Sequence, residues 1–273
     1  MDYFYSIFAG IIQGLTEFLP VSSSGHLVLF HDFLGFDFPD QVAFDVVLHL
    51  GTLVALLLFF HRDVIKYLLA FFRSLYQWRL KQDVDQRLAW YLFLATIPAG
   101  IFGYWFESEI ETIFRSPVIV AWMLIIVGLL LYFADSFFKK EKDIEQLTFM
   151  NAMNIGLAQA LALVPGVSRS GITIITGLSQ KLKRDQAARF SFLLSMPIVF
   201  AAGLKKTVDL VVESGLQSVD YLILILGFVS SAVTGYFCIK YFLRFLRDHS
   251  LTVFVFYRIV LGLVILIAIL FFK

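Results

Sequence analysis

Apolar runs long enough to cross a membrane recur along the whole chain. A helix needs about 20 predominantly apolar residues to cross the hydrocarbon core. Hydrophobic residues make up 59% of the 273 residues and charged residues only 16%, a balance that a soluble domain does not need. We therefore predict an all-α, multi-pass integral membrane protein. Six uninterrupted spans are predicted at 42–61, 88–106, 117–138, 187–207, 221–243 and 252–272.

Two further apolar regions, 3–38 and 151–182, are each interrupted by polar residues. Irregular backbone at membrane depth is tolerated only where protein or a water-filled cavity receives its polar groups. We therefore predict two re-entrant helical hairpins whose tips lie inside the membrane. Both breaks hold serines and a glycine shortly after a proline, in Pro20-Val21-Ser22-Ser23-Ser24-Gly25 and in Pro165-Gly166-Val167-Ser168-Arg169-Ser170-Gly171.

The charged residues between the apolar regions predict the orientation of the chain. By the positive-inside rule, the segments rich in Lys and Arg are cytoplasmic. The segments 107–116 and 208–220 are mainly acidic and are predicted outside, although Lys205 and Lys206 count against the second placement. The basic segments are 62–87, 139–150, 181–189 and 240–249.

This path makes the two hairpins enter from opposite faces, the first from outside and the second from the cytoplasm. Such an arrangement is typical of an inverted repeat. We predict a single membrane domain over 1–273, with approximate inverted repeats at 1–140 and 150–250 and a C-terminal span. The chain starts without a basic leader, so no cleaved signal peptide is expected.

The first break combines a carboxylate, hydroxyls and an imidazole. Gln13 and Glu17 lie four residues apart, on one face of a helix, and could supply oxygen ligands to Mg²⁺ or Ca²⁺. Ser22 to Ser24 precede the next half-helix, whose free N–H groups favour an anion. His26 lies within one helical turn of Ser23 and could exchange a proton with its hydroxyl.

A purely structural interpretation of the first break would make the serines helix caps, Glu17 a paired charge and His26 a packed ring. A mid-membrane charge costs about 2.5–3.5 kcal/mol on insertion scales. Such a group is usually retained for a site, so we favour the functional interpretation.

The second break carries Arg169, the only cation between Lys142 and Lys181. An arginine flanked by hydroxyls at the start of a helix suits an oxyanion. The alternative is that Arg169 pairs only with Glu17 and holds the two hairpins together. The two interpretations are compatible, because Arg169 could pair with Glu17 while no oxyanion is bound. The predicted substrate-binding residues are Ser22, Ser168, Ser170, Thr173, Gly166 and Gly171.

Other features are less specific. Asp45 and His49 share a helix face and either support the site or pair with each other, and we favour pairing. The net charge of +1 predicts no nucleic-acid partner. The two breaks together predict a phosphate or diphosphate site, because they combine a carboxylate, an amide, hydroxyls, an arginine and two half-helix N-termini. The lipid-facing helices around this site suit a substrate with an apolar tail.

At these residues the chain resembles the undecaprenyl-diphosphate phosphatase family, bacterial membrane enzymes associated with bacitracin resistance. The first family motif, Glu/Gln-x-x-x-Glu followed by Pro-x-Ser-Ser-x-Gly-His, runs here from Gln13 to His26. The second, Pro-Gly-x-Ser-Arg-Ser-x-x-Thr, runs complete from Pro165 to Thr173. Many members have Glu where this chain has Gln13, so a metal site would lose one formal charge.

The resemblance implies a hydrolase of the bacterial inner membrane that converts undecaprenyl diphosphate to the monophosphate and recycles the carrier lipid for cell-wall synthesis. It also implies a divalent cation, Mg²⁺ or Ca²⁺, held by Glu17 with Gln13. Our hypothesis makes Ser23 the nucleophile, His26 or Glu17 its base, and Arg169 the residue that stabilises the phosphoryl oxygens. The sequence does not exclude the exchanged roles of Ser23 and His26, and it is compatible with a homodimer.

Two rival functions remain. A polyprenyl-phosphate transporter or flippase would also use inverted repeats and re-entrant hairpins, and fold does not decide function. An acid-phosphatase-like lipid phosphatase with a histidine nucleophile is suggested by Ser24-Gly25-His26, but no companion His and Asp follow Ser168-Arg169 at the required spacing.

Overall fold

The computed structural model describes residues 2–27, 41–106, 116–213 and 221–272. Within these residues the chain is helical and contains no strand beyond one isolated bridge, between Lys142 and Leu182. This confirms the all-α prediction. The helices are α1 (Asp2–Thr16), α3 (Gln41–Phe59), α4 (His61–Tyr76), α5 (Val84–Trp105), α7 (Pro117–Phe137), the single 3₁₀ turn η1 (Ile144–Gln146), α8 (Phe149–Leu161), α9 (Arg169–Ser179), α10 (Arg184–Glu213), α11 (Tyr221–Asp248) and α12 (Thr252–Phe272).

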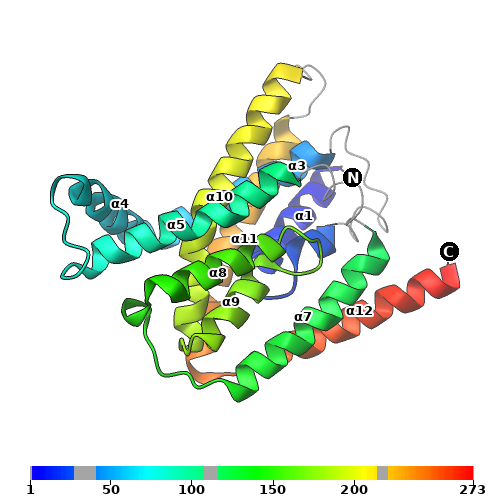
Figure 1. The fold of residues 1–273 in the computed structure, drawn as a ribbon. Helices are drawn as coiled ribbons and strands as arrows, with labels where there is room; N and C mark the ends of the chain where they lie inside the picture. The colour runs from blue at the N-terminus through cyan, green and yellow to red at the C-terminus, as the bar shows by residue number, and fades with distance from the viewer. Residues whose placement is uncertain (1, 28–40, 107–115, 214–220, 273) are drawn as a thin grey trace.

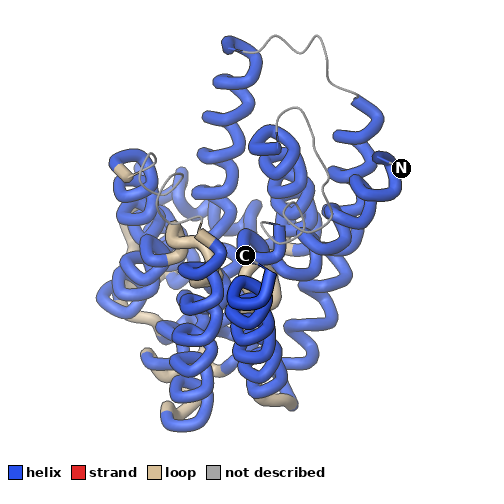
Figure 2. The backbone as a smooth tube through the Cα atoms, turned by 90° about the vertical axis from the view of Figure 1, so that its right-hand side faces the viewer, coloured by secondary structure: helices blue, strands red, loops and turns tan. Residues whose placement is uncertain are grey.

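Each of the six predicted spans is a helix, because α3, α5, α7, α10, α11 and α12 fall on the six apolar runs. Among the described residues, five of them are long and apolar enough to cross a membrane by themselves. The sixth, α3, passes only together with α4, from which it is bent by 82°. The protein is therefore a multi-pass membrane protein with five or six candidate spans (Figure 2).

Helix α4 falls in the segment 62–87, for which we predicted basic charge and a cytoplasmic position but no helix. It buries Tyr67, Ala70 and Ser74, at helical spacing, and leaves Leu69 and Phe72 more than half exposed. Exposed apolar and basic side chains on one short helix are typical of a segment that lies along a membrane surface. The bend at Phe60 turns the chain from the span into this helix.

Two glycines bring the first limb of each hairpin unusually close to a neighbouring helix. A Cβ at Gly14 would lie 2.7 Å from the Ser231 carbonyl oxygen of α11, and a Cβ at Gly156 would lie 2.2 Å from the Ala95 carbonyl oxygen of α5. Small residues at such positions let membrane helices approach backbone to backbone. The glycines thus fix α1 against α11 and α8 against α5.

The predicted cytoplasmic segments contact one another. The Arg87 side chain donates a hydrogen bond to the Glu145 carbonyl oxygen at 2.8 Å, and the Lys183 ammonium lies 2.9 Å from a carboxylate oxygen of Asp143. These contacts place the segments around α4, η1 and α10 at one end of the molecule.

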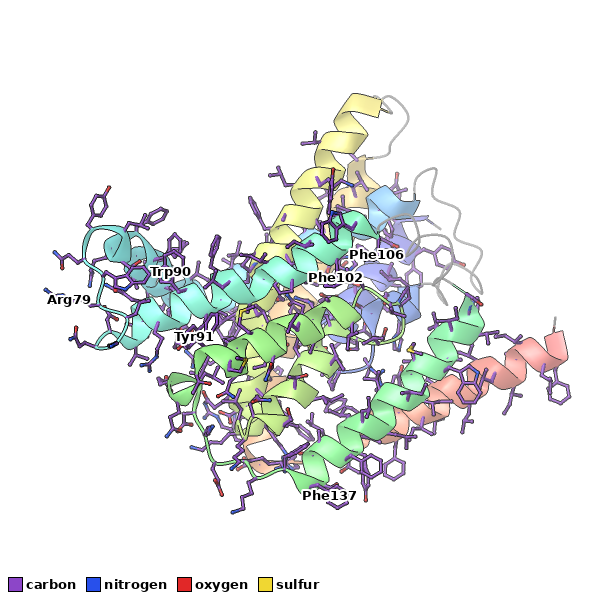
Figure 3. The ribbon with its side chains drawn as sticks, viewed as in Figure 1. Arg79, Trp90, Tyr91, Phe102, Phe106 and Phe137 are labelled. Carbon is purple, nitrogen blue, oxygen red and sulfur yellow. The ribbon has the colours of Figure 1, made fainter. Side chains whose placement is uncertain are left out.

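The N-terminus of α1 lies toward the other end in Figure 1, at about the height of the C-terminal end of α5, whereas α8 starts beside η1. Figure 3 marks the two ends of α5, with Trp90 and Tyr91 near the first and Phe102 and Phe106 at the second. The hairpins therefore start from opposite ends of the molecule, as predicted. The returning limb of the first hairpin beyond Leu27 lies outside the described residues.

Candidate active site

The two hairpin breaks have the same backbone form. Ser22 and Ser168 have φ angles of 74° and 72°, a left-handed conformation that costs a non-glycine residue on the order of 1–3 kcal/mol. Each serine hydroxyl accepts a hydrogen bond from the N–H three residues later, at 3.3 Å from Gly25 and at 3.1 Å from Gly171. Each break thus ends in a serine cap on a new helix.

The residue after each cap binds the same carboxylate. The Ser23 hydroxyl donates a hydrogen bond to Oε2 of Glu17 at 2.7 Å, and Nη2 of Arg169 forms an ion pair with Oε1 of Glu17. Glu17 itself is 7% exposed. The ion pair between Glu17 and Arg169, which we offered as an alternative, is therefore present, and it joins the two hairpins.

Two further side chains surround Glu17. The amide Nε2 of Gln13 donates to Oε2 of Glu17 at 3.0 Å, and Nε2 of His49 lies 3.7 Å from the same oxygen. Nδ1 of His49 donates to the backbone carbonyl of Asp45 at 2.7 Å. His49 therefore contacts Glu17 as well as the Asp45 backbone, which agrees with the alternative in which it supports the site.

A cavity of about 190 Å³, which we call the hairpin cavity, opens at this cluster. Its walls combine polar side chains with apolar residues from α5, from α10 and from the turn that follows α8, such as Ala99, Val199 and Leu163. The polar residues that line it are Glu17, Ser23, Ser24, His49, Gln159, Ser168 and Arg169.

Unpartnered polar atoms concentrate at the hairpin cavity. Among the described residues, six buried side-chain polar atoms have no hydrogen-bond partner, and four of them belong to Gln13, Gln159 and Arg169. Buried polar groups in folded proteins are normally paired. The guanidinium Nη1 of Arg169 and both polar atoms of the Gln159 amide are therefore available to a ligand.

Several residues predicted to bind substrate lie behind the cavity wall. The Ser170 hydroxyl donates to the Leu19 carbonyl oxygen at 3.0 Å, and the Thr173 hydroxyl donates to the Arg169 carbonyl oxygen at 2.7 Å. Gly166 has a φ of +91°, and a Cβ there would lie 2.7 Å from the Val120 carbonyl oxygen. The residues that shape the breaks in this way, without lining the cavity, are Ser22, Ser170, Thr173, Gly166 and Gly171.

His26 is directed away from the Ser23 hydroxyl. Its Nδ1 donates to the Ser22 carbonyl oxygen at 2.7 Å, and its Nε2 lies 2.6 Å from the Tyr257 hydroxyl. The His26 and Tyr257 rings are stacked, with centroids 5.7 Å apart. The predicted proton exchange between His26 and Ser23 is therefore absent in this arrangement, and Glu17 is the base within reach.

Sequence analysis missed Arg258, a fully buried arginine in α12. Its guanidinium donates to the carbonyl oxygens of Pro20 at 3.0 Å and of Gly166 at 2.9 Å, one from each break. It also reaches carbonyl oxygens of Val167, Met123 and Leu124. The signal was available, because Arg258 is a lone cation inside an apolar span, as Arg169 is inside its own.

The donor set can be tested against a divalent cation. In the described part of the chain, no three His, Cys, Asp or Glu side chains lie close enough together to hold a metal ion by themselves. Glu17 supplies one carboxylate, and Oε1 of Gln13 is a buried acceptor without a partner. Mg²⁺ is commonly held by one or two carboxylates together with substrate phosphates. The residues thus fit a cation that shares its ligands with a phosphate group.

A model of the bacitracin resistance protein BacA family matches residues 6–264. The chain belongs to this family. The match covers both hairpin breaks and every residue of the hairpin cavity.

Curated relatives agree over almost the full length. The undecaprenyl-diphosphatase of Rubrobacter xylanophilus is 47% identical over 264 residues, 96% of each chain. The proteins of the same name from Desulforudis audaxviator and Halothermothrix orenii are 46% and 43% identical, each over 98% of both chains. These relatives, like the family model, match the chain over almost its whole length.

Proposed function

We propose that this protein is an undecaprenyl-diphosphatase, which hydrolyses undecaprenyl diphosphate to undecaprenyl phosphate and inorganic phosphate. The proposal rests on one observation: the Ser23 hydroxyl and the Arg169 guanidinium both bind the buried carboxylate of Glu17. A hydroxyl, a base and a cation at one cavity are the parts that phosphoryl transfer requires. The names of the relatives supply the lipid.

In the first step the Ser23 oxygen attacks the terminal phosphorus of the diphosphate. Its proton passes to Oε2 of Glu17, which already accepts a hydrogen bond from the hydroxyl at 2.7 Å. The bond between the terminal phosphorus and the bridging oxygen breaks, and undecaprenyl phosphate leaves. Water then hydrolyses the phosphoserine, releasing inorganic phosphate and returning the proton to Ser23.

Arg169 stabilises the charge that develops on the phosphoryl oxygens. Its Nη2 holds Glu17, whereas Nη1 is buried without a partner and is free to bind a phosphoryl oxygen. One guanidinium can therefore keep the base in place and neutralise the transferred group. The N-terminal N–H groups of the two helices that start at Ser23 and Arg169 add to the positive potential.

The divalent cation belongs to this proposal as well. Glu17 and Gln13 would hold it together with oxygens of the diphosphate. Such a cation neutralises phosphate charge and orients the leaving group.

We place the protein in the bacterial inner membrane, with the apolar tail of the substrate among the lipid-facing helices. A transporter or flippase is not favoured, because the relatives are named as diphosphatases and the hairpin cavity holds a hydroxyl directly on a base. A homodimer remains a prediction, to be tested by the mass of the protein in detergent.

The test is phosphate release from a long-chain polyprenyl diphosphate by the purified protein in detergent. Wild type with Mg²⁺ or Ca²⁺ is expected to release phosphate, and EDTA is expected to abolish release. Vectorial movement of the lipid in liposomes without phosphate release would overturn the proposal in favour of transport.

A further inference from the structure

A second cavity, of about 520 Å³, lies at the predicted cytoplasmic end of the molecule, and we call it the basic cavity. Its cations come from two helices, Arg189 from α10 and the others from α11. Phe59 and Phe60 form part of its wall at the bend between α3 and α4. The residues that line it are Phe59, Phe60, Asp63, Arg189, Lys240, Leu243, Arg244 and Arg247.

The basic cavity carries an excess of positive charge. Lys240, Arg244 and Arg247 are spaced four and three residues apart, so they lie on one face of α11. Across the described residues, none of these three has a carboxylate within ion-pair distance. Like charges at this spacing repel each other and destabilise a helix. An anion in the cavity would remove that repulsion.

Asp63, the one acidic residue that lines the basic cavity, already forms an ion pair with Arg189. Nη2 of Arg189 contacts both carboxylate oxygens of Asp63, at 2.7 and 2.8 Å. The Nε of Arg189 is buried and has no partner within the described part of the structure. The ion pair therefore holds a guanidinium at the cavity with one donor still free.

The basic cavity is separate from the hairpin cavity. Along α3, Phe59 lies ten residues beyond His49, which lines the hairpin cavity. Along α10, Arg189 lies nine residues before Ile198, which also lines it. At 1.5 Å per residue, both helices place the two cavities roughly 15 Å apart. An anion in the basic cavity is therefore not the diphosphate at Arg169.

We propose that the basic cavity binds the phosphate of an anionic lipid from the cytoplasmic leaflet. Clusters of Lys and Arg at a membrane surface attract anionic headgroups. The lipid source is favoured over free phosphate because an apolar groove of about 520 Å³ is lined by α3, α4, α5 and α10, and α3, α4 and α10 also contribute residues to the basic cavity. Leu57 of this groove precedes Phe59 by two residues, and Leu193 follows Arg189 by four. A headgroup in the basic cavity leaves its acyl chain beside this groove.

The test compares two triple variants, each of which loses three positive charges at the predicted cytoplasmic face of the protein. The cavity variant combines Lys240→Gln, Arg244→Gln and Arg247→Gln. The control variant combines Arg62→Gln, Arg73→Gln and Arg79→Gln, which change exposed cations that do not line the basic cavity. Both variants also carry Arg169→Ala, as does the parent, so that phosphate binding at the hairpin cavity does not contribute.

The readout is the thermal unfolding midpoint of the full chain in neutral detergent during titration with short-chain phosphatidic acid, phosphatidylcholine or inorganic phosphate. Phosphatidic acid is expected to raise the midpoint of the parent and of the control variant equally. Each cation near an anionic headgroup contributes about fivefold in affinity, so the cavity variant is expected to bind on the order of a hundredfold more weakly.

Three results would overturn the proposal. Equal weakening in the control variant would assign the effect to overall charge. An equal response to phosphatidylcholine would show that the phosphate charge is not recognised, and a full response to inorganic phosphate alone would make free phosphate the ligand. None of these measurements needs turnover, so their outcome is independent of whether the protein is a diphosphatase.

Discussion

The two hairpin breaks share a backbone conformation but carry different functional side chains. Both use a serine at positive φ to cap a new helix, at Ser22 and at Ser168. The next residue is Ser23 in the first break and Arg169 in the second, and both bind Glu17. The first break thus supplies a hydroxyl and its base, whereas the second supplies a cation. The same backbone conformation thus presents two different chemical groups, and a complete site needs residues from both breaks.

The largest expected effect comes from Arg169, the cation of the second break. Arg169→Ala should lower kcat/KM for polyprenyl diphosphate by about 10³-fold or more, the size of arginine contributions in phosphoryl transfer. Arg169→Lys should recover only part of this, because an ammonium cannot hold Glu17 and a phosphoryl oxygen with separate planar donors. Steady-state phosphate release measures both. Full activity of the lysine variant would mean that charge alone is needed.

The next effect tests whether the two breaks must be held together. Arg258→Met would remove the donors that contact Pro20 and Gly166 and would leave buried carbonyl oxygens unpaired. We expect a fall in kcat of about 100-fold, because small displacements of catalytic groups cost that much. Circular dichroism should still show a helical protein with a lower unfolding midpoint.

Arg258→Lys is the matched control for this variant, since it keeps the charge and part of the donors. It should recover stability more fully than kcat. If both variants lost stability while kcat stayed at the wild-type value, Arg258 would hold the fold without positioning the breaks.

A smaller effect is expected at Gln159, which lines the hairpin cavity with its amide unpaired. Gln159→Leu should lower kcat/KM about tenfold by removing one hydrogen bond to a charged group. The unfolding midpoint should stay the same or rise, because no partner is left unpaired. Gln82→Leu on the exposed surface is the control. An unchanged kcat/KM would place the diphosphate away from α8.

The smallest effect tests the likeness of the two breaks. Ser22→Ala and Ser168→Ala each remove a cap, which should cost about 1 kcal/mol of stability in both cases. Their unfolding midpoints should therefore fall by similar amounts. Their activities should differ, because only Ser168 lines the hairpin cavity. Equal losses of activity would remove the distinction between a cap and a cavity residue.

Much of this arrangement is predictable from the sequence. The apolar runs predict all six long helices, and the polar breaks with Glu17 and Arg169 predict where the site lies. The six helices are confirmed, and the ion pair between Glu17 and Arg169 is present because a charge inside lipid needs a partner, which few residues can provide. The assignment of the site residues remains a prediction. The internal repeat beyond the two breaks remains a prediction.

Other features depend on tertiary packing. Sequence spacing put His26 near Ser23, yet its ring is turned toward Tyr257 on α12, 231 positions away in sequence. His49 and Arg258 reach the site from α3 and α12, and only tertiary packing determines which side of each helix faces the site. Helix α4 was hidden because its charges outweighed the helical spacing of Tyr67, Ala70 and Ser74.

The most direct test of the division between the two breaks is to trap the phosphorylated protein. Substrate labelled in its terminal phosphate is quenched with acid during turnover, and the labelled residue is mapped by mass spectrometry. The account predicts phosphoserine at Ser23, formed slowly in the Arg169→Ala variant and absent in Ser23→Ala. A label on His26, or turnover without any label on the protein, would contradict it.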